Sequence, residues 1–398
     1  MRPASWAATA ATAATAWSVA AAPATRCQQP SLHMLDSIIG RKQGIQDSGA
    51  ASSTLESGIL SQALQEAIAR YPSTKDKYAR YLSDVLDIAS SKGLTDAAQA
   101  AKKPLDRFSL ATAIQTAIKS DVAPVTEKSV EAYKAIAASL PLQKRNPDGG
   151  LWYYLYPEWS YLDGIFSLLP YMASQTNRNL RDMRLQLDLL REHCAQASTS
   201  LFVHGYDWSR NAVWANKITG ASPYVWGRAL GWFLSGLVQT WDQLSCKSAE
   251  RGQLLQLCGD IHNVTFQVSA ALVQYADPKT GAWWQIVTLP GREGNYLESS
   301  STALFTFSIL KALRIGLLYG DVPSYRETAI KAYSYMRDNF VTDTGHGTIG
   351  FDKTVSVCSL NSTATYEYYT KRPILPNSLL GESAFVLASL EVERLGGH

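Results

Sequence analysis

From residue 55 onward, apolar residues recur at intervals of three and four positions along most of the chain. This spacing is that of an amphipathic helix, and breaks rich in Gly, Pro and Ser separate the periodic stretches. The alternation of polar and apolar residues that marks a half-buried strand is scarce. The sequence therefore predicts a mostly helical protein, with helices over residues 55–69, 76–89, 110–118, 161–173, 179–197, 225–244, 253–275, 300–318, 325–339 and 379–395.

Four of these stretches open alike, with aromatic, small or acidic residues that lead into an apolar helix. Their marker residues Asp163, Arg228, Ser301 and Gly381 have one or two other helical stretches between them. Helical hairpins recur in this way in a toroid, where inner helices line a central cavity and outer helices wrap them. We expect the starts of the inner helices to meet at one end, around a cleft. A solenoid without a site is the alternative, but it gives no reason for Trp, Asp and Arg to recur at corresponding helix starts.

The charge and the aromatic content of the chain limit the kinds of ligand that it could bind. The chain has 398 residues, a formal net charge of +3 and only 18% charged residues, which disfavours a disordered chain or a phosphate-backbone binder. It also has 11 Trp and 20 Tyr. These side chains join a flat apolar face to a polar atom, so they suit contact with an uncharged or mildly acidic amphipathic ligand such as a sugar. Filling of the core is the other interpretation.

The first 24 residues resemble a secretory signal peptide. Arg2 precedes an Ala-rich run, and Ala20, Ala22 and Ala24 fit an A-x-A cleavage pattern. We therefore expect a leader over residues 1–24, a single catalytic domain over residues 25–398, and a secreted, extracellular protein. No later segment approaches the length of an apolar membrane span, so no membrane association is expected.

The five cysteines predict no zinc site, because none forms a CxxC pair or lies close to paired histidines. In a secreted protein one or two disulfides are expected, with Cys246 and Cys258 nearest in sequence, and the odd count leaves one thiol unpaired. Two sequons begin at Asn263 and Asn361 and permit glycosylation in that compartment.

Carboxylates are the best candidates for chemistry, since the sequence has no G-x-S-x-G, phosphate loop, H-E-x-x-H or dinucleotide fingerprint. Asp163 begins a helix just after Trp159 and Tyr161, and desolvation by these rings would raise its pKa and make it a general acid. Its other interpretation is a helix N-cap. Asp106 is the best second carboxylate, with a surface cap paired with Arg107 as its alternative.

The segment from His204 to Trp232 is the densest in aromatic and polar residues. Arg228 and Trp232 are four positions apart and share a helix face, so they could hold a sugar carboxylate while the indole stacks on the sugar ring. The structural alternative is an Arg228 that simply stacks on Trp232. For His204 the alternative is a core histidine.

Several motifs, in order, resemble the unsaturated rhamnogalacturonyl hydrolases of glycoside hydrolase family 105, and more distantly the unsaturated glucuronyl hydrolases of family 88. The resemblance extends from about residue 75 to the C-terminus, and the stretches 291–296 and 355–361 resemble the secreted fungal branch. The motifs are Asn146-Pro147-Asp148-Gly149-Gly150-Leu151-Trp152, Tyr161-Leu162-Asp163-Gly164, His204-Gly205-Tyr206-Asp207, Trp214-Ala215-Asn216, Gly220-Ala221-Ser222-Pro223 and Trp226-Gly227-Arg228-Ala229-Leu230-Gly231-Trp232.

The resemblance implies an all-α (α/α)6 barrel and a reaction on pectin fragments that end in a 4,5-unsaturated galacturonic acid. A carboxylic acid protonates C4 of the vinyl ether, water adds at C5, and the resulting hemiketal opens and releases the sugar. The family's acid/base aspartate falls on Asp163 and its second aspartate on Asp106. The residues it places on the substrate fall on Tyr161, His204, Arg228, Trp232, Trp226 and Trp152.

The reaction requires no metal and no cofactor, and the expected partner is an oligosaccharide bound by a monomer or weak oligomer, with no nucleic acid. Bacterial members tend to have basic residues soon after the position of Trp152, where this chain has Tyr153 and Tyr154, so contacts to the substrate would differ there. Two other functions stay open. One is an unsaturated glucuronyl hydrolase or another helical-barrel glycosidase, and the other is a toroid that binds carbohydrate without cleaving it.

Overall fold

Six long helices form a closed inner ring in the computed structural model, which describes residues 29–396 except 47–48, 155–157 and 321–323. Each packs on the next, and the last packs on the first, so the chain closes on itself. The ring confirms the predicted toroid and its (α/α)6 architecture. Its helices are α2 (Ser53–Arg70), α5 (Arg107–Ser120), α7 (Gly164–Ser174), α9 (Gly227–Gln243), α11 (Ser299–Arg314) and α14 (Leu379–Leu395).

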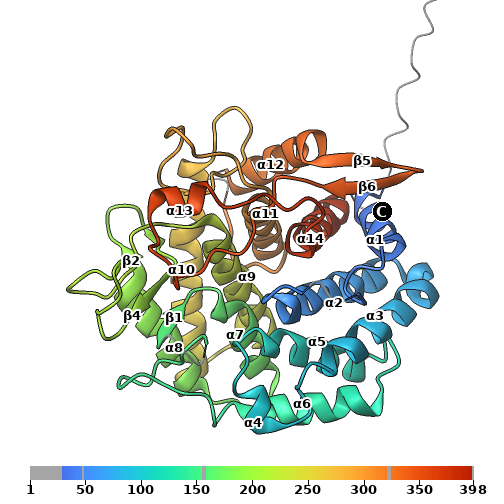
Figure 1. Ribbon diagram of the computed structural model, residues 1–398, viewed down its shortest axis with the longest axis horizontal. Coiled ribbons are helices and arrows are strands. Elements are labelled where there is room, and N and C mark those ends of the chain that lie inside the picture. The colour runs from blue at the N-terminus through green and yellow to red at the C-terminus, as the bar shows by residue number, and fades with distance from the viewer. Residues whose placement is uncertain (1–28, 47–48, 155–157, 321–323, 397–398) are drawn as a thin grey trace, which may run out of the picture.

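Six outer helices alternate with the inner ones along the chain and pack against them. Figure 1 shows the colours passing around the molecule until the red α14 lies beside the blue α1 and α2. The outer helices are α1 (Pro30–Gly40), α3 (Lys75–Ser90), α6 (Glu127–Ser139), α8 (Leu180–Cys194), α10 (Gly252–Tyr275) and α12 (Tyr325–Asn339); two short helices, α4 (Ala97–Ala100) and α13 (Tyr366–Thr370), lie in the connections.

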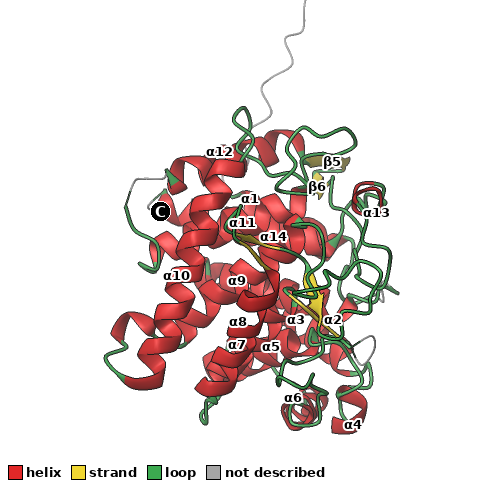
Figure 2. Ribbon diagram, turned by 90° about the vertical axis from the view of Figure 1, so that its left-hand side faces the viewer, coloured by secondary structure: helices red, strands yellow, loops and turns green. Residues whose placement is uncertain are grey.

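The strands are short and form three antiparallel pairs: β1 (Trp159–Tyr161) with β4 (Gly205–Asp207), β2 (Ala195–Gln196) with β3 (Leu201–Phe202), and β5 (Val341–Gly345) with β6 (Thr348–Phe351). Figure 2 shows that most long loops, together with α13 and the β5–β6 hairpin, lie on one side of the helices. The marker residues Asp163, Arg228, Ser301 and Gly381 all fall within or next to the first turn of an inner helix.

The sequence did not predict the outer helices α1 and α6. Most of the residues that α6 buries are small (Ser129, Ala132, Ala135, Ser139), and Ile136 is the one large apolar side chain among them, so the helical period is weak. The stretch predicted as 179–197 ends earlier, because the backbone turns extended after Cys194 and pairs as β2 with β3.

Cys246 and Cys258, the two cysteines nearest in sequence, form a disulfide, a pairing that the sequence alone left open. Cys194 and Cys358 are buried free thiols, while Cys27 and the expected leader over residues 1–24 lie outside the described residues. Within the described part of the chain, no helix is both long and apolar enough to cross a membrane.

The inner ring depends on close helix contacts, and at Gly236 in α9 the close neighbours are backbone atoms of another inner helix. A Cβ at this position would lie 2.6 Å from the carbonyl oxygen of Ile165 and 2.7 Å from the backbone nitrogen of Phe166, both in α7. Backbone atoms cannot move aside as a flexible side chain can. The absence of a side chain at Gly236 therefore sets the distance between α9 and α7, the helix that follows Asp163.

Gly236→Ala should destabilise the protein by about 1–3 kcal/mol, because the added methyl group forces α7 and α9 apart in a packed core. Urea denaturation followed by circular dichroism would measure the change. Gly259→Ala in the outer helix α10 is the matched control: nothing lies within 4 Å of its new methyl group. That control should be neutral or stabilising by up to about 1 kcal/mol, and equal destabilisation by the two substitutions would contradict the packing argument.

Candidate active site

The starts of the inner helices surround a small cavity at one end of the barrel. Ser52 and Asp106 precede α2 and α5, Asp163 precedes α7, Arg228 lies in the first turn of α9 and Leu380 in that of α14, and all five line the cavity. The cleft expected at the inner helix starts is therefore present, and the two candidate aspartates line the same cavity. The other lining residues are Leu55, Tyr153, Tyr154, Tyr161, Trp226, Trp232, Val357 and Cys358.

Asp163 is positioned by the short β1–β4 ribbon. Tyr161 pairs with Gly205, and the amide of Leu162 donates to the carbonyl of His204, so the start of α7 lies against the loop that holds the histidine. The Asp163 side chain is only 11% exposed, and its Oδ2 has no hydrogen-bond partner among the described residues. A buried carboxylate oxygen without a partner is available to a ligand.

Asp106 is buried against the tyrosines that follow Trp152. The hydroxyl of Tyr153 donates a hydrogen bond to its Oδ1. Burial raises the pKa of Asp106 to about 7; the negative charge of Asp163 adds to this rise, while the Tyr153 hydrogen bond opposes it. Asp106 therefore holds its proton at pH values where an ordinary aspartate is ionised.

Neither aspartate acts as a helix cap. Asp106 and Asp163 occupy the N-cap positions of α5 and α7, yet both have helical backbone angles and neither side chain accepts a hydrogen bond from its helix. The capping interpretation is therefore wrong for both, and so is the pairing of Asp106 with Arg107, whose guanidinium donates to Ser139, Gln143 and two backbone carbonyls instead. Both carboxylates are free to face the cavity.

His204 lies between Asp163 and the C-terminal part of the chain. It is fully buried; its Nδ1 is 2.8 Å from the hydroxyl of Tyr369 and its Nε2 is 3.5 Å from Asp163 Oδ2. If the Tyr369 hydroxyl donates to Nδ1, the ring proton is on Nε2 and points toward Asp163. Tyr161 and Trp226 pack on the ring at centroid distances of 5.2 and 4.6 Å.

Arg228 does not stack on Trp232, the residue with which it was expected to share a helix face, but on Trp226. Its guanidinium lies over the ring of Trp226 at 4.9 Å, while Trp232 packs against Phe166 at 4.6 Å. Arg228 Nη1 donates to the carbonyl of Val355, and Nη2 donates to that of Ser356 at 2.9 Å. Helical spacing alone could not predict this arrangement, because the two carbonyls belong to a loop more than 120 residues away.

That loop, residues 354–358, is the part of the site that sequence reasoning missed. Glu298, the N-cap of α11, is fully buried and accepts a hydrogen bond from the backbone of Val355 at 3.0 Å, in addition to bonds from Ser300 and Ser301. The loop then presents its carbonyls to Arg228 and its residues Val357 and Cys358 to the cavity. An acidic residue directly before three serines was the available signal.

Among the residues predicted to contact the substrate, Trp152 neither lines the cavity nor lies against a residue discussed above that lines it. Its ring packs under the Lys144 ammonium at 5.4 Å, and its neighbours Tyr153 and Tyr154 line the cavity in its place. Tyr161, Arg228, Trp226 and Trp232 line the cavity, and His204 lies directly behind Asp163. Among the described residues, no group of three or more His, Cys, Asp or Glu side chains could hold a metal ion.

The closed ring of helices and the acidic, aromatic cavity at one of its ends define the class of helical-barrel glycoside hydrolases. The model of Glycosyl Hydrolase Family 88 matches residues 56–396, and the chain therefore belongs to this family. It is a glycoside hydrolase of a family that acts on unsaturated oligosaccharides.

Individual proteins are similar to this chain in sequence or in fold. The chain is 29% identical over 216 residues to Protein Atu3128 of Agrobacterium fabrum, covering 51% of this chain and 89% of that protein. Its fold is similar to that of a family 105 glycoside hydrolase of C. acetobutylicum (TM-score 0.77, 24% identity, 92% and 99% of the two chains). It is also similar to that of the unsaturated glucuronyl hydrolase of Bacillus sp. GL1 (TM-score 0.62, 14% identity, 92% and 97%).

The raised pKa of Asp106 predicts that stability falls as the pH rises from about 4 to about 7. Over this range the unfolded chain has released the proton that folded Asp106 retains, so each pH unit lowers the free energy of unfolding by up to about 1.4 kcal/mol through this group. Asp106→Asn should make the dependence flatter in urea denaturation curves measured between these pH values. A variant that follows the wild-type slope would contradict the assignment.

Asp182→Asn is a control for which the opposite dependence of stability on pH is expected. Burial acts to raise the pKa of Asp182, but hydrogen bonds from Arg145 and Gln186 outweigh it and lower the pKa. The stability that this carboxylate contributes is present above the pKa of an unfolded aspartate and is lost as the pH falls through its own lower value. The deficit of the variant should therefore be largest near neutral pH and shrink in acid.

Proposed function

We propose that this enzyme is an unsaturated rhamnogalacturonyl hydrolase, which releases the 4,5-unsaturated galacturonic acid from the non-reducing end of pectin-derived oligosaccharides. One observation supports the chemistry above all others. Two carboxylates that do not cap their helices line the same cavity at neighbouring helix starts. Burial, to which the charge of Asp163 adds, raises the pKa of Asp106 to about 7, so Asp106 keeps a proton near neutral pH.

In the proposed reaction Asp163, the more accessible of the two carboxyl groups, delivers a proton to C4 of the vinyl ether. The double-bond electrons form the new C–H bond and leave an oxocarbenium-like centre at C5, which the ring oxygen stabilises. The Asp163 carboxylate then accepts a proton from the water that adds to C5. The hemiketal opens to a ketone, and the glycosidic link at C1 breaks. His204 Nε2, 3.5 Å from Asp163, stabilises the carboxylate form.

Arg228 is suited to bind the carboxylate on C5 of the substrate. Two of its N–H groups are bound to the carbonyls of Val355 and Ser356, which fixes the guanidinium at the cavity wall. The remaining N–H groups can make charge-assisted bonds to an acid group. A single fixed cation matches a substrate with one uronate and agrees with the modest net charge of the chain.

The tyrosines at the cavity favour a neutral sugar as the next residue of the substrate. Tyr153, Tyr154 and Tyr161 pack against one another at centroid distances of 4.7, 4.9 and 5.7 Å and form an aromatic wall beside the two aspartates. Such a wall stacks on a deoxy sugar such as rhamnose but offers no cation for a sulfated or second acidic sugar.

Asp163→Asn should lower kcat by about 10²–10⁴-fold, because the amide can neither donate the proton nor accept one from water. The readout is the loss of absorbance of the unsaturated uronyl group with lyase-generated rhamnogalacturonan disaccharide. Asp188→Asn on the outer helix α8, where the side chain is 43% exposed, is the control and should retain full activity. Unchanged turnover in Asp163→Asn would overturn the mechanism.

The substrate is tested separately with unsaturated disaccharides that carry rhamnose, glucose or an N-acetylated amino sugar as the second residue. The highest kcat/KM is expected for unsaturated galacturonyl-rhamnose. Preference for an unsaturated glucuronyl disaccharide would point to a glucuronyl hydrolase. Binding of the intact disaccharide with no turnover of any substrate would favour a carbohydrate-binding toroid.

The same proposal includes secretion. The pattern of residues 1–24 is that of a leader, and the Cys246–Cys258 disulfide is typical of an oxidising compartment. Asn361 is exposed in a loop and available for glycosylation, whereas Asn263 lies within helix α10. Sequencing of the N-terminus after expression in a eukaryotic secretion host should show a mature chain that begins near residue 25; an intact Met1 in the medium or an unprocessed cellular protein would contradict the leader.

A further inference from the structure

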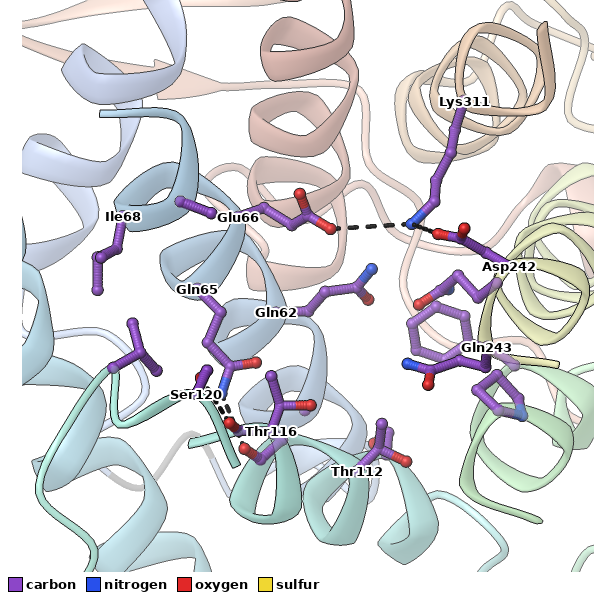
Figure 3. Close-up of a pocket in the computed structure, with 18 of the residues that line it drawn as sticks. Gln62, Gln65, Glu66, Ile68, Thr112, Thr116, Ser120, Asp242, Gln243 and Lys311 are labelled. Atoms are coloured by element: carbon purple, nitrogen blue, oxygen red, sulfur yellow. Dashed lines mark hydrogen bonds and ion pairs between the residues drawn. The ribbon is translucent and has the colours of Figure 1, made fainter. Parts of the chain in front are cut away.

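A second cavity, of about 440 Å³, lies at the opposite end of the barrel, where the inner helices end. Its walls are formed by α2, α5, α7, α9 and α11, mainly by their middle and last turns, while Ser109 and Phe166 reach it from the first turns of α5 and α7. Figure 3 shows side chains around an open centre. The volume is within the range of small-molecule sites, roughly 300–1,000 Å³. The catalytic proposal uses none of the residues that line it.

Four carboxamides and four hydroxyls line this cavity among apolar and charged side chains. Gln62 and Gln243 extend toward its middle from α2 and α9, and Thr112 and Thr116 face it from α5 (Figure 3). Neither Gln62 nor Gln243 makes a hydrogen bond to any described residue, and the buried Nε2 of Gln239 has no partner in the same part of the chain. Gln62 is half-buried and Gln243 is exposed, whereas the Nε2 of Gln239 is buried. Buried polar atoms normally have partners, so this Nε2 is available to a ligand that the other two amides can also reach.

The charges at the cavity balance. Lys311 is almost fully buried and its ammonium lies 3.8 Å from Glu66 Oε1 and 3.3 Å from Asp242 Oδ2, between the two carboxylates. Glu66 also pairs with Arg394 at 2.6 Å, outside the cavity wall. With Lys75 at the rim, two cations face two anions. Lys75 is exposed and makes no ion pair with a described residue, whereas the buried charge of Lys311 is neutralised within the wall.

We infer that this cavity is a binding site for a neutral saccharide. Amides that offer both donors and acceptors, hydroxyls and one aromatic face, that of Phe166, match the alternating hydroxyls and apolar patches of a sugar ring. The balanced charges exclude the acid group that Arg228 is suited to bind at the other end. The two ends of the barrel thus select chemically different sugars.

The two cavities are neighbours along the barrel axis and are separated by one aromatic pair. Trp232 lines the catalytic cavity, Phe166 lines the second cavity, and their rings pack at 4.6 Å. Ser109 also lines the second cavity and donates to the backbone carbonyl of Asp106 at 2.7 Å. A sugar in the second cavity would therefore touch residues that pack directly against the catalytic wall.

The test uses methyl α-L-rhamnopyranoside and methyl β-D-galactopyranoside as probes, with saturation-transfer NMR titrations on the full protein. Binding in the millimolar range is expected. The variant Gln62→Leu/Gln243→Leu keeps the side-chain size but removes both amides, and it should weaken binding at least about tenfold, since each lost hydrogen bond is worth roughly a factor of five. Its circular dichroism and hydrolytic activity should stay within about twofold of wild type.

Gln253→Leu/Gln267→Leu is the matched control, because both residues are exposed on the outer helix α10. It should bind the glycosides like wild type. Arg228→Lys should also retain this binding while it loses affinity for the unsaturated disaccharide, which keeps the two sites separate whatever the outcome for the catalytic proposal. Absence of saturation transfer, equal binding by both double variants, or displacement of the glycoside by the unsaturated disaccharide at the catalytic cavity would each overturn the inference.

Discussion

The parallel direction of the six inner helices is the constraint on which the rest of the structure depends. Because each outer helix returns the chain to the same end, the starts of α2, α5, α7, α9 and α14 meet at the catalytic cavity, while α2, α5, α7, α9 and α11 line the second cavity. Each helix start brings backbone N–H groups without intrahelical partners and the positive end of its dipole. Several starts around one cavity favour negative charge there, whether it belongs to a side chain or to a uronate.

Three carboxylates at inner helix starts differ in whether they bind the free N–H groups. Glu298 does so, since it accepts a hydrogen bond from the first turn of α11 and another from the loop that holds Arg228. Asp106 and Asp163 occupy equivalent positions but leave their helices uncapped, and each gives up the stabilisation that a cap supplies, typically about 1 kcal/mol. Ser52, Thr74, Ser324 and Ser378 also leave their helices without a side-chain cap. Asp106 and Asp163 differ from them in that both bring a carboxylate to the same cavity.

The sequence was sufficient for the features that depend on local pattern. Helical period predicted the whole inner ring, and the recurrence of Asp163, Arg228, Ser301 and Gly381 predicted which ends of the helices meet. It was insufficient wherever contacts join distant segments. The hydrogen bond from Tyr369 to His204, the carbonyls of Val355 and Ser356 on Arg228, and the choice of Trp226 over Trp232 all depend on loops that close over the cavity. Trp152 was placed at the site through its motif, but the backbone turn directs the next two tyrosines there instead.

The same architecture explains why a second polar cavity persists at the other end. Inner helices that diverge enough to admit a substrate at their starts cannot fill the whole axis with apolar side chains, and the Phe166–Trp232 pair closes it only in the middle. Below that pair the helix ends expose carbonyls, which favour donors, and Lys311 and the carboxamides are donors. The charge of Lys311 is neutralised within the wall by Glu66 and Asp242, so the donors that stay available are the uncharged amides. The barrel axis is thus divided into one cavity suited to a sugar with an acid group and a second cavity suited to an uncharged sugar.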